Sequence, residues 1–215
     1  MENKSTELVF ILDKSGSMSG LENDTIGGYN SMLKKQRDVK GKCNITTVLF
    51  DHNYELLHDR IDIRAIDPIT EEEYFVEGST ALLDAIGKTI HKIGNVQKHT
   101  IDEYRAEKVL FVIITDGMEN SSREYSSRIV KQMIEHQKER YGWEFIFLGA
   151  NIDAVETAAM YGINANRAQN YRADSRGVAV SYDAMGEAVS CFCQIGEIDD
   201  DWNATIDEDF KSRES

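Results

Sequence analysis

Two short apolar runs constrain the fold of this chain more than any other feature. Residues 8–12 are five consecutive apolar residues, and residues 108–115 form the most hydrophobic run of the sequence. Both runs are shorter than a buried helix of usual length and contain β-branched residues, so each is predicted to be a strand buried on both faces. Such strands belong to sheets that helices cover above and below.

Strand and helix patterns alternate along the rest of the chain. Further strands are predicted over residues 44–50, 54–57, 143–148 and 165–171. Helices are predicted over residues 21–37, 81–93, 121–140, 153–161 and 175–196, with smaller helical pieces at 71–75 and 96–104. Turn residues at 51–53 join two strands into a hairpin. The pattern predicts an α/β three-layer, doubly wound sandwich, with a mostly parallel sheet of about six strands and one antiparallel edge strand.

Length and composition predict one domain and a short tail. A chain of 215 residues is long enough for one sizeable core, and no Pro-, Ser- or Gly-rich linker divides it. We therefore predict a single domain over residues 1–196. Residues 197–215 hold eight Asp or Glu against two Lys or Arg, so they are predicted to form a frayed acidic C-terminal tail.

Charge and cysteine content narrow the classes of partner and compartment. The net charge of −14 argues against nucleic acid as a partner, and the apolar runs are too short to span a membrane. Three cysteines are not a disulfide framework, which predicts a reducing, cytoplasmic location. Cys191 and Cys193 lie in an apolar helical stretch and are predicted to be core residues, and the five histidines show no ligand spacing.

Oxygen-bearing side chains occur at three separate points of the predicted sheet. Asp13, Ser15 and Ser17 follow the first strand, Thr80 precedes a helix, and Asp116 follows the most apolar strand. Loops at the carboxyl ends of the strands converge at one edge of a doubly wound sheet. Hard oxygen donors suit Mg²⁺, or Mn²⁺ or Ca²⁺, better than zinc or copper. We therefore expect these five side chains to form a site for a divalent cation.

The balance of ligand types indicates a role for such an ion. Two carboxylates just neutralise a divalent cation, and three neutral hydroxyls leave it electron-poor, so a carboxylate from a partner would gain by binding it. Five candidate groups leave one exchangeable position on an ion that takes six ligands. The alternative is that Asp13 and Ser15 only cap the following helix and that Asp116-Gly117 is only a turn.

The three motifs together resemble the metal-ion-dependent adhesion site of von Willebrand factor type A (VWA) domains. They are Asp13-x-Ser15-x-Ser17, Gly78-Ser79-Thr80 and Thr115-Asp116-Gly117, in the order of that family, within an element pattern that covers roughly residues 7–196. The resemblance implies that Asp13, Ser15, Ser17, Thr80 and Asp116 hold the metal. It also implies a protein partner that presents an acidic residue, and a stand-alone bacterial or phage intracellular protein. Glu77-Gly78-Ser79 stands where paired glycines are common in the family.

Two other functions use the same residues. A metal-assisted hydrolase of phosphate or ester substrates would need a general base, for which Glu119 and Asp84 are the candidates. A purely structural metal would stabilise the fold without a partner. An aspartate after the first strand is also typical of phosphoryl transfer, but Ser15 stands where that class has its second Asp, and no GxxxxGK, GxSxG or HExxH motif is present. The binding module, which is not an enzyme, is therefore the main prediction.

Overall fold

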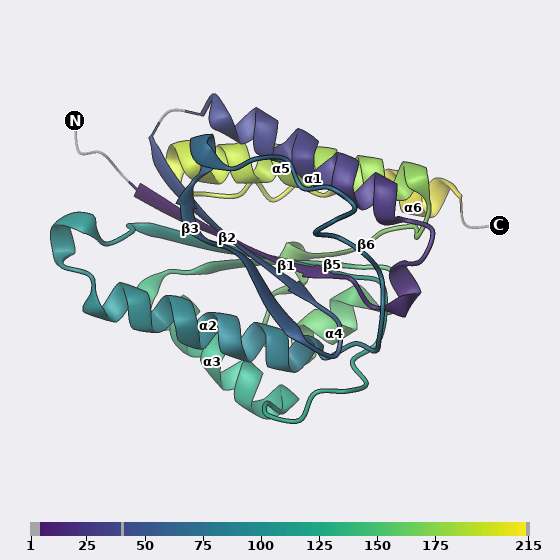
Figure 1. The fold of residues 1–215 in the computed structure, drawn as a ribbon, viewed down its shortest axis with the longest axis horizontal. Coiled ribbons are helices and arrows are strands. Elements are labelled where there is room, and N and C mark those ends of the chain that lie inside the picture. Colours follow the sequence, from purple (N-terminus) through teal and green to yellow (C-terminus); the bar gives the residue numbers. More distant parts are fainter. Residues whose placement is uncertain (1–4, 40, 214–215) are drawn as a thin grey trace.

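The computed structural model describes residues 5–39 and 41–213, and within them the chain forms one six-stranded sheet covered by helices on both faces (Figure 1). The order of strands across the sheet is β3-β2-β1-β4-β5-β6. The strands are β1 (Ser5–Asp13), β2 (Lys42–Phe50), β3 (Tyr54–Asp62), β4 (Lys108–Thr115), β5 (Glu144–Gly149) and β6 (Ala168–Asn170). This is the three-layer architecture that the alternating pattern predicts.

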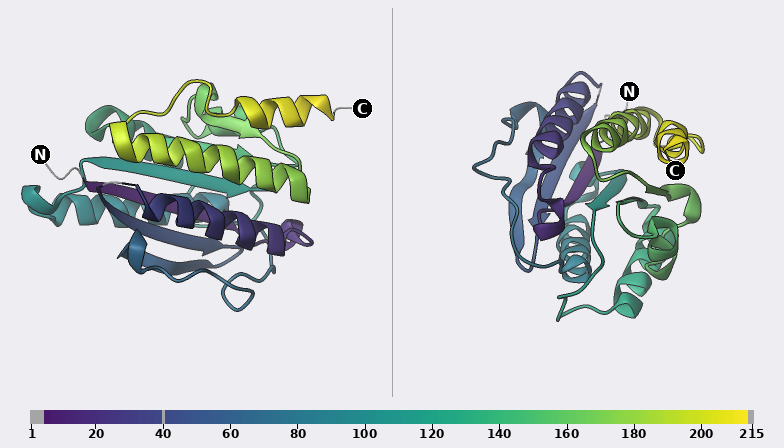
Figure 2. Two further views of the ribbon diagram at one scale, coloured as in Figure 1. Left: turned by 90° about the horizontal axis from the view of Figure 1, so that it is seen from above. Right: turned by 90° about the vertical axis from the view of Figure 1, so that its right-hand side faces the viewer.

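Six α-helices lie in the described part of the chain. They are α1 (Glu22–Arg37), α2 (Leu82–His99), α3 (Ser127–Tyr141), α4 (Ala154–Met160), α5 (Ser175–Ile195) and α6 (Ala204–Ser212). Helices α1 and α5 lie side by side over one face of the sheet (Figure 2), and α2, α3 and α4 lie on the other face (Figure 1). None of the helices among the described residues is long and apolar enough to cross a membrane.

The sheet is parallel except at one edge. Strand β1 pairs in parallel with β2 and β4, and β4, β5 and β6 continue the parallel order, whereas β3 is antiparallel to β2. The predicted antiparallel edge strand is therefore confirmed. The helix predicted at residues 71–75 is wrong: the backbone N–H groups of Glu73 and Tyr74 both donate to the Thr70 carbonyl, which closes a turn. The helix predicted to end at residue 93 continues as α2 to His99.

Side chains of β1 alternate between two buried layers. Leu8, Phe10 and Leu12 pack in the layer under α1 and α5, while Val9 and Ile11 pack in the layer over α2 and α3. All five are at most 1% exposed. Burial of each such side chain stabilises the fold by about 1.5–3 kcal/mol. The parallel register pairs Leu12 with Leu49 of β2 and with Ile114 of β4, so β1 ends level with the ends of both neighbours.

The acidic C-terminal segment is folded. Ile198, Trp202 and Ile206 are buried in the layer of α1 and α5, and α6 covers the segment between Ala204 and Ser212. The indole N–H of Trp202 donates to the carbonyl of Asn166 at 2.9 Å. The prediction of a frayed tail is therefore wrong for residues 197–213, because three apolar residues among the acids are enough to anchor them. The domain boundary at residue 196 stays a prediction.

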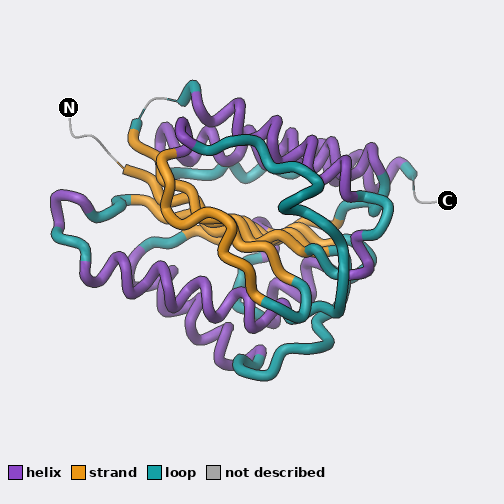
Figure 3. Tube along the Cα trace, in the orientation of Figure 1, coloured by secondary structure: helices purple, strands orange, loops and turns teal. Residues whose placement is uncertain are grey.

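The carboxyl ends of the parallel strands lie at one end of the molecule. There the loops after β1 and β4 meet the long connection that follows β3 and leads into α2, as Figure 3 shows at its right-hand end. The predicted oxygen ligands belong to these three loops. Short backbone hydrogen bonds join the loops, from Gly16 N–H to the Gly78 carbonyl at 3.1 Å and from Asn120 N–H to the Thr80 carbonyl at 3.0 Å.

Candidate metal centre

Asp13 is the last residue of β1, and hydrogen bonds fix both of its carboxylate oxygens. The Ser15 N–H donates to Oδ1 at 2.7 Å, and the Thr115 hydroxyl donates to Oδ2 at 2.6 Å. The side chain is 1% exposed. Burial raises the pKa of Asp13, although the hydrogen bonds from Ser15 and Thr115 favour the ionised form and oppose the rise. Asp13 therefore ties the end of β1 to the end of β4.

Three hydroxyl groups form a continuous chain beside Asp13. The Thr80 hydroxyl donates to Ser15 Oγ at 2.9 Å, and Ser15 Oγ lies 3.1 Å from Ser17 Oγ. Ser15 and Thr80 are buried, while Ser17 is exposed. The structure thus brings together hydroxyls that lie 65 residues apart in the sequence. The cluster faces solvent on the side of Ser17.

Asp116 has a buried carboxylate without a partner. It is 1% exposed, and in the described residues neither Oδ1 nor Oδ2 accepts a hydrogen bond. Burial raises the pKa of Asp116 to about 6, and the charge of Asp13 adds to the rise, while the nearby Ser17 hydroxyl opposes it. A buried, unpaired carboxylate is costly, and a bound cation is one of the few groups that would compensate it.

Close packing around Gly117 brings the loop after β4, which is the third loop of the site, next to the hydroxyls. A Cβ atom at this position would lie 2.9 Å from Ser17 Oγ and 3.4 Å from Thr80 Oγ1. The residue after Asp116 must therefore be a glycine if the loops are to keep this spacing. Gly78 has the same importance in the second loop, because its φ of +72° is in the left-handed region and a Cβ there would lie 2.1 Å from His52 Nδ1. A single glycine thus makes the turn where the family often has two.

The one lysine of the first motif does not neutralise the carboxylates. Lys14 is buried and points to the edge of the sheet, where its Nζ lies 2.9 Å from Glu55 Oε2 and 4.2 Å from the centre of the Phe75 ring. In residues 5–39 and 41–213, neither Asp13 nor Asp116 takes part in an ion pair. The described residues therefore supply no positive charge that neutralises this pair.

Asp13 and Ser15 of the first motif do not cap the helix that follows them. Helix α1 begins after Leu21, with no side-chain cap, and Ser15 precedes a short 3₁₀ turn without capping it. The Asp13 carboxylate is taken up by Ser15 and Thr115 instead. The capping alternative is therefore wrong for Asp13 and Ser15.

Asn120 is a positioning residue on the loop that follows β4. Its side-chain oxygen accepts from the Thr80 N–H at 3.0 Å, and its own N–H donates to the Thr80 carbonyl. Asn120 thus holds both sides of the residue that carries one of the hydroxyls. Tyr74, which the sequence did not single out, donates its hydroxyl to the Asp13 carbonyl.

Asp84 and Glu119, the two candidates for a general base, both accept hydrogen bonds from backbone N–H groups. Asp84 accepts from the N–H groups of Arg123, Glu124 and Tyr125 at 2.9 Å each. Burial raises the pKa of Asp84, but these three hydrogen bonds outweigh it, so the pKa is lowered overall. Glu119 accepts from the Leu83 N–H at 2.9 Å and from the Ser122 hydroxyl at 2.7 Å. Both side chains fasten the third loop to the start of α2.

Asp51 is a further buried carboxylate at this edge of the sheet. It follows β2, is fully buried, and its Oδ2 has no hydrogen-bond partner among the described residues. Its carbonyl accepts from the Ala81 N–H at 2.8 Å, directly beside Thr80. The signal for Asp51 was the same as for Asp116, an acid directly after a buried strand, but its place beside His52 and Asn53 favoured a turn.

The donor set fits a hard divalent cation. Two carboxylates and three hydroxyls supply only oxygen, which is the ligand type of Mg²⁺, Mn²⁺ and Ca²⁺. In the described residues, no group of three or more His, Cys, Asp or Glu is placed to hold a metal. A metal at this edge would therefore depend on the hydroxyls of Ser15, Ser17 and Thr80 as well as on the carboxylates of Asp13 and Asp116. That these five residues bind an ion stays a prediction.

Comparison with solved structures identifies the fold as that of a VWA domain. The vWF domain of the type V pili tip protein Mfa5 from Porphyromonas gingivalis has a TM-score of 0.64 at 12% identity, over 93% of this chain and 100% of its own. The manganese-loaded TRAP protein of Plasmodium vivax has a TM-score of 0.58 at 20% identity, over 83% of this chain and 72% of its own. No protein-family profile matches the sequence, and no curated protein matches it significantly.

A third similar structure is proximal thread matrix protein 1 of the mussel byssus, solved with a zinc-occupied MIDAS motif. It has a TM-score of 0.58 at 12% identity, over 88% of this chain. The present chain spans 46% of that protein, and 43% of a von Willebrand factor type A protein from Catenulispora acidiphila. These likenesses show the fold. A stand-alone intracellular protein of bacterial or phage origin stays a prediction.

Proposed function

We propose that this protein is a divalent-metal-dependent protein-binding module. Asp13, Ser15, Ser17, Thr80 and Asp116 would hold a Mg²⁺-type ion, which would accept an Asp or Glu carboxylate from a protein partner. The observation that carries the proposal is the Asp116 carboxylate, which is buried beside three hydroxyls and accepts no hydrogen bond from any described residue. Manganese in the TRAP structure and zinc in the MIDAS motif of the byssus protein support a metal on this fold.

Exposure on one side of the cluster supports an open position. Ser17 and Gly16 are exposed, and Met118, two residues after Asp116, is 73% exposed. A partner could therefore approach from the side of Ser17 and cover the Met118 side chain. When bound, the ion would supply positive charge at a place where residues 5–39 and 41–213 offer none.

The hydrogen bonds of Asp84 and Glu119 support binding rather than hydrolysis. A general base needs a free lone pair within reach of the reacting proton. The carboxylates of both residues are committed to backbone N–H groups of the loop. These hydrogen bonds weigh against Asp84 and Glu119 as the general base of a metal-assisted hydrolase.

Affinity capture with and without metal tests the proposal. The immobilised protein is incubated with an extract from its source cells in Mg²⁺ or in excess EDTA, with Asp116→Asn and the exposed loop variant Glu77→Gln in parallel. We expect a partner that the wild type and Glu77→Gln retain only in Mg²⁺, and that Asp116→Asn does not retain. A partner that is retained equally in EDTA would show that no metal bridge exists.

A further inference from the structure

Two thiols lie together at the end of the sheet opposite the candidate metal centre. Cys43 is the second residue of β2, and Cys193 lies in the last turn of α5. Both are free thiols, each residue is 9% exposed, and both belong to the layer between the sheet and the helices α1 and α5. The fold thus brings together two cysteines that are roughly 150 residues apart, so a bond between them would close most of the domain into one loop.

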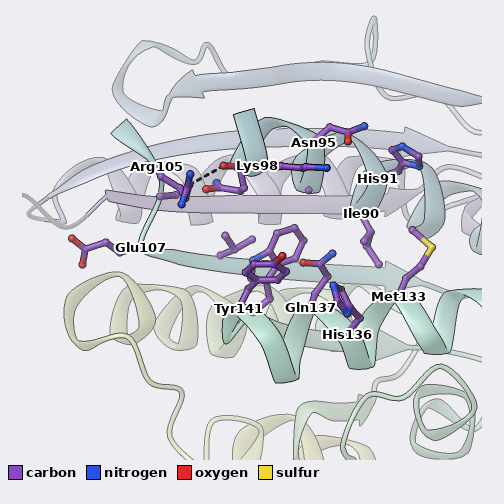
Figure 4. Close-up of a pocket in the computed structure, with 15 residues that line it drawn as sticks. Ile90, His91, Asn95, Lys98, Arg105, Glu107, Met133, His136, Gln137 and Tyr141 are labelled. Atoms are coloured by element: carbon purple, nitrogen blue, oxygen red, sulfur yellow. Dashed lines mark hydrogen bonds between the residues drawn. The ribbon is translucent and has the colours of Figure 1, made fainter. Parts of the chain in front are cut away.

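A row of three side chains crosses the sheet below the end of α5. Cys43 of β2 is paired with Thr6 of β1, and Thr6 is paired with Lys108 of β4. Neighbouring strands are about 4.8 Å apart, so the row spans roughly 10 Å. Val109, the residue after Lys108, lines a cavity between α2 and α3 on the other face of the sheet (Figure 4). Because successive side chains of a strand point to opposite faces, Lys108 points to α5.

Cys193 contacts all three members of this row. The Lys108 ammonium group donates to the Cys193 carbonyl at 2.9 Å and to the Phe192 carbonyl at 3.2 Å. The Cys43 thiol and the Thr6 hydroxyl each donate a hydrogen bond to the Cys193 sulfur. The two sulfur atoms are therefore direct neighbours, and a bond between them requires no rearrangement of the sheet.

The surroundings of the two sulfur atoms make Cys193 the thiol that ionises more readily. The hydrogen bond from Cys43 lowers the pKa of Cys193, burial opposes this, and the charge of Lys108 adds to the lowering. The same hydrogen bond and burial raise the pKa of Cys43. A helix C-terminus disfavours a negative charge, but here the Lys108 ammonium group binds the carbonyls of the last turn. Cys193 is therefore the nucleophile of the pair, and Cys43 keeps its proton.

We propose that Cys43 and Cys193 form a peroxide-sensitive thiol pair, which closes to an intramolecular disulfide and is opened again by a dithiol. Helix ends fray, so the last turn of α5 gives a molecule as small as hydrogen peroxide a route to the sulfur atoms. The pair lies at the other end of the sheet from the candidate metal centre, and it does not depend on the proposed function.

The oxidation proceeds in two displacements at sulfur. The Cys193 thiolate attacks one oxygen of hydrogen peroxide, the O–O bond breaks, and the released hydroxide takes up the proton of the Cys193 thiol and leaves as water. The Cys43 sulfur then attacks the sulfur of the resulting sulfenic acid, the S–O bond breaks, and a second water leaves with the Cys43 proton. The two thiols lose two electrons in total, and peroxide accepts them.

Cys191 is the third thiol of the chain, and the fold separates it from this pair. It is partly exposed, and its sulfur lies 3.9 Å from Asp199 Oδ2. Burial and the charge of Asp199 raise the pKa of Cys191. Residues 191 and 193 are two positions apart on a helix, so their side chains do not face each other. The folded protein therefore directs the bond from Cys43 to Cys193, whereas an unfolded chain has no reason to prefer Cys193 over Cys191.

Peptide mapping after oxidation tests the pairing. The wild type, folded or in concentrated urea, is treated with hydrogen peroxide in EDTA, the remaining thiols are blocked, and unreduced peptides are identified by mass spectrometry. We expect the folded protein to lose two of its three thiols, to join the peptides of Cys43 and Cys193, and to regain both thiols in dithiothreitol. In urea, Cys191 and Cys193 should be found joined to Cys43 in similar amounts.

Substitutions test the order of the two steps. In Cys43→Ala the sulfenic acid of Cys193 should persist and react with dimedone, whereas Cys193→Ala should not be labelled. Cys191→Ser is the matched control and should close the disulfide as the wild type does. Closure should raise the melting temperature by at least about 5 °C in the wild type and in Cys191→Ser, and peroxide should not raise it in the other two variants.

Three results would overturn the proposal. The first is a folded wild type that keeps all three thiols in excess peroxide. The second is a disulfide of the folded protein that contains Cys191. The third is dimedone labelling of Cys193→Ala as strong as that of Cys43→Ala, which would show that Cys193 is not the nucleophile. The mapping of the wild type decides the first two without any substitution.

Discussion

The Asp116 carboxylate is the buried charge of the candidate metal centre that lacks a compensating partner. It is buried beside Asp13, has no hydrogen bond among the described residues, and no basic side chain compensates it. Burial and the charge of Asp13 disfavour the ionised form of Asp116, which raises its pKa to about 6. Without a cation, an ionised Asp116 therefore destabilises the folded protein. With a cation, the same carboxylate becomes a favourable ligand.

Asp116→Asn is expected to stabilise the metal-free protein and to abolish metal binding. A neutral amide costs less to bury than an unpaired carboxylate, so the free energy of unfolding should rise by about 1–2 kcal/mol at pH 8. Urea unfolding in EDTA measures the gain, and titration calorimetry with Mg²⁺ measures the loss of affinity. Should the variant be less stable than the wild type in EDTA, Asp116 would have a partner that stabilises its charge.

The raised pKa of Asp116 also sets a pH dependence with a definite sign. In the metal-free protein the folded state keeps the Asp116 proton up to about pH 6, while the unfolded chain loses it near 3.8. The contribution of this group to stability is therefore largest below about pH 4 and is lost as pH rises through about 6. The stability gap between Asp116→Asn and the wild type should widen from pH 4 to pH 7 in EDTA. A gap that stays constant over this range would contradict the raised pKa.

Gly117→Ala is a test of loop spacing alone. The added methyl group would lie 2.9 Å from Ser17 Oγ and would push the first and third loops apart. We expect Mg²⁺ affinity to fall by roughly tenfold, which corresponds to about 1.4 kcal/mol, while the fold is retained. The circular dichroism spectrum checks the fold, and calorimetry checks the affinity. Unchanged affinity would mean that these hydroxyls do not contact the ion.

Residues with chemical motifs could be singled out from the sequence, but positioning residues could not. Asp13, Ser15 and Asp116 stand directly after apolar strands, where the sheet must bring them to one edge. Asn120 and Tyr74 have no such signal, because each acts on the backbone of a residue more than 35 positions away. Such contacts depend on how the loops pack, and this is set by the tertiary structure.

Strands and helices with strong hydrophobic patterns agree with prediction, whereas the connections between them do not. Strand β4 has the predicted bounds, because Lys108 is followed by one continuous apolar run, and seven of the eight strand residues are buried. The start of α3 lies at Ser127 rather than 121, because Asp84 and Glu119 hold residues 121–125 in an extended loop through hydrogen bonds with their backbone. Helix propensity in this segment is overridden by two carboxylates from outside it.

Asp84→Ala is expected to release this loop. The variant leaves three backbone N–H groups of residues 123–125 without their acceptor, at a cost of about 1–3 kcal/mol. Because the loop also carries Asn120, which holds Thr80, Mg²⁺ affinity should fall as well. Urea unfolding and Mg²⁺ titration are the measurements, with the exposed helix variant Lys131→Ala as control. A variant with wild-type stability would show that these three hydrogen bonds contribute nothing to the fold.

At the level of the whole molecule, the sandwich was predictable and the role of its acidic end was not. Alternating strand and helix patterns determine the layers, and short apolar strands require helices on both faces. Acidic composition suggested a frayed end, but Trp202 and Ile206 are buried and attach α6 to the layer of α1 and α5. Composition averages over a segment, whereas burial depends on single apolar residues at helical spacing.

Trp202→Ala tests whether this segment belongs to the cooperative unit. Truncation of a buried Trp costs about 3–5 kcal/mol when it is part of the core. We expect a single unfolding transition that is shifted by an amount in this range, with the exposed α6 variant Thr205→Ala within about 0.5 kcal/mol of the wild type. Equal stability of Trp202→Ala and the wild type would mean that α6 and the segment before it unfold independently.

The number of Mn²⁺ ions bound per chain shows whether the three loops form one oxygen-only cation site. Free Mn²⁺ is measured by its paramagnetic resonance signal during titration with the wild type, Asp116→Asn and Glu77→Gln. We predict one bound ion per chain for the wild type and for Glu77→Gln, and none for Asp116→Asn. A wild type that takes up no Mn²⁺, or an Asp116→Asn variant that binds the ion as the wild type does, would show that these loops do not form the cation site.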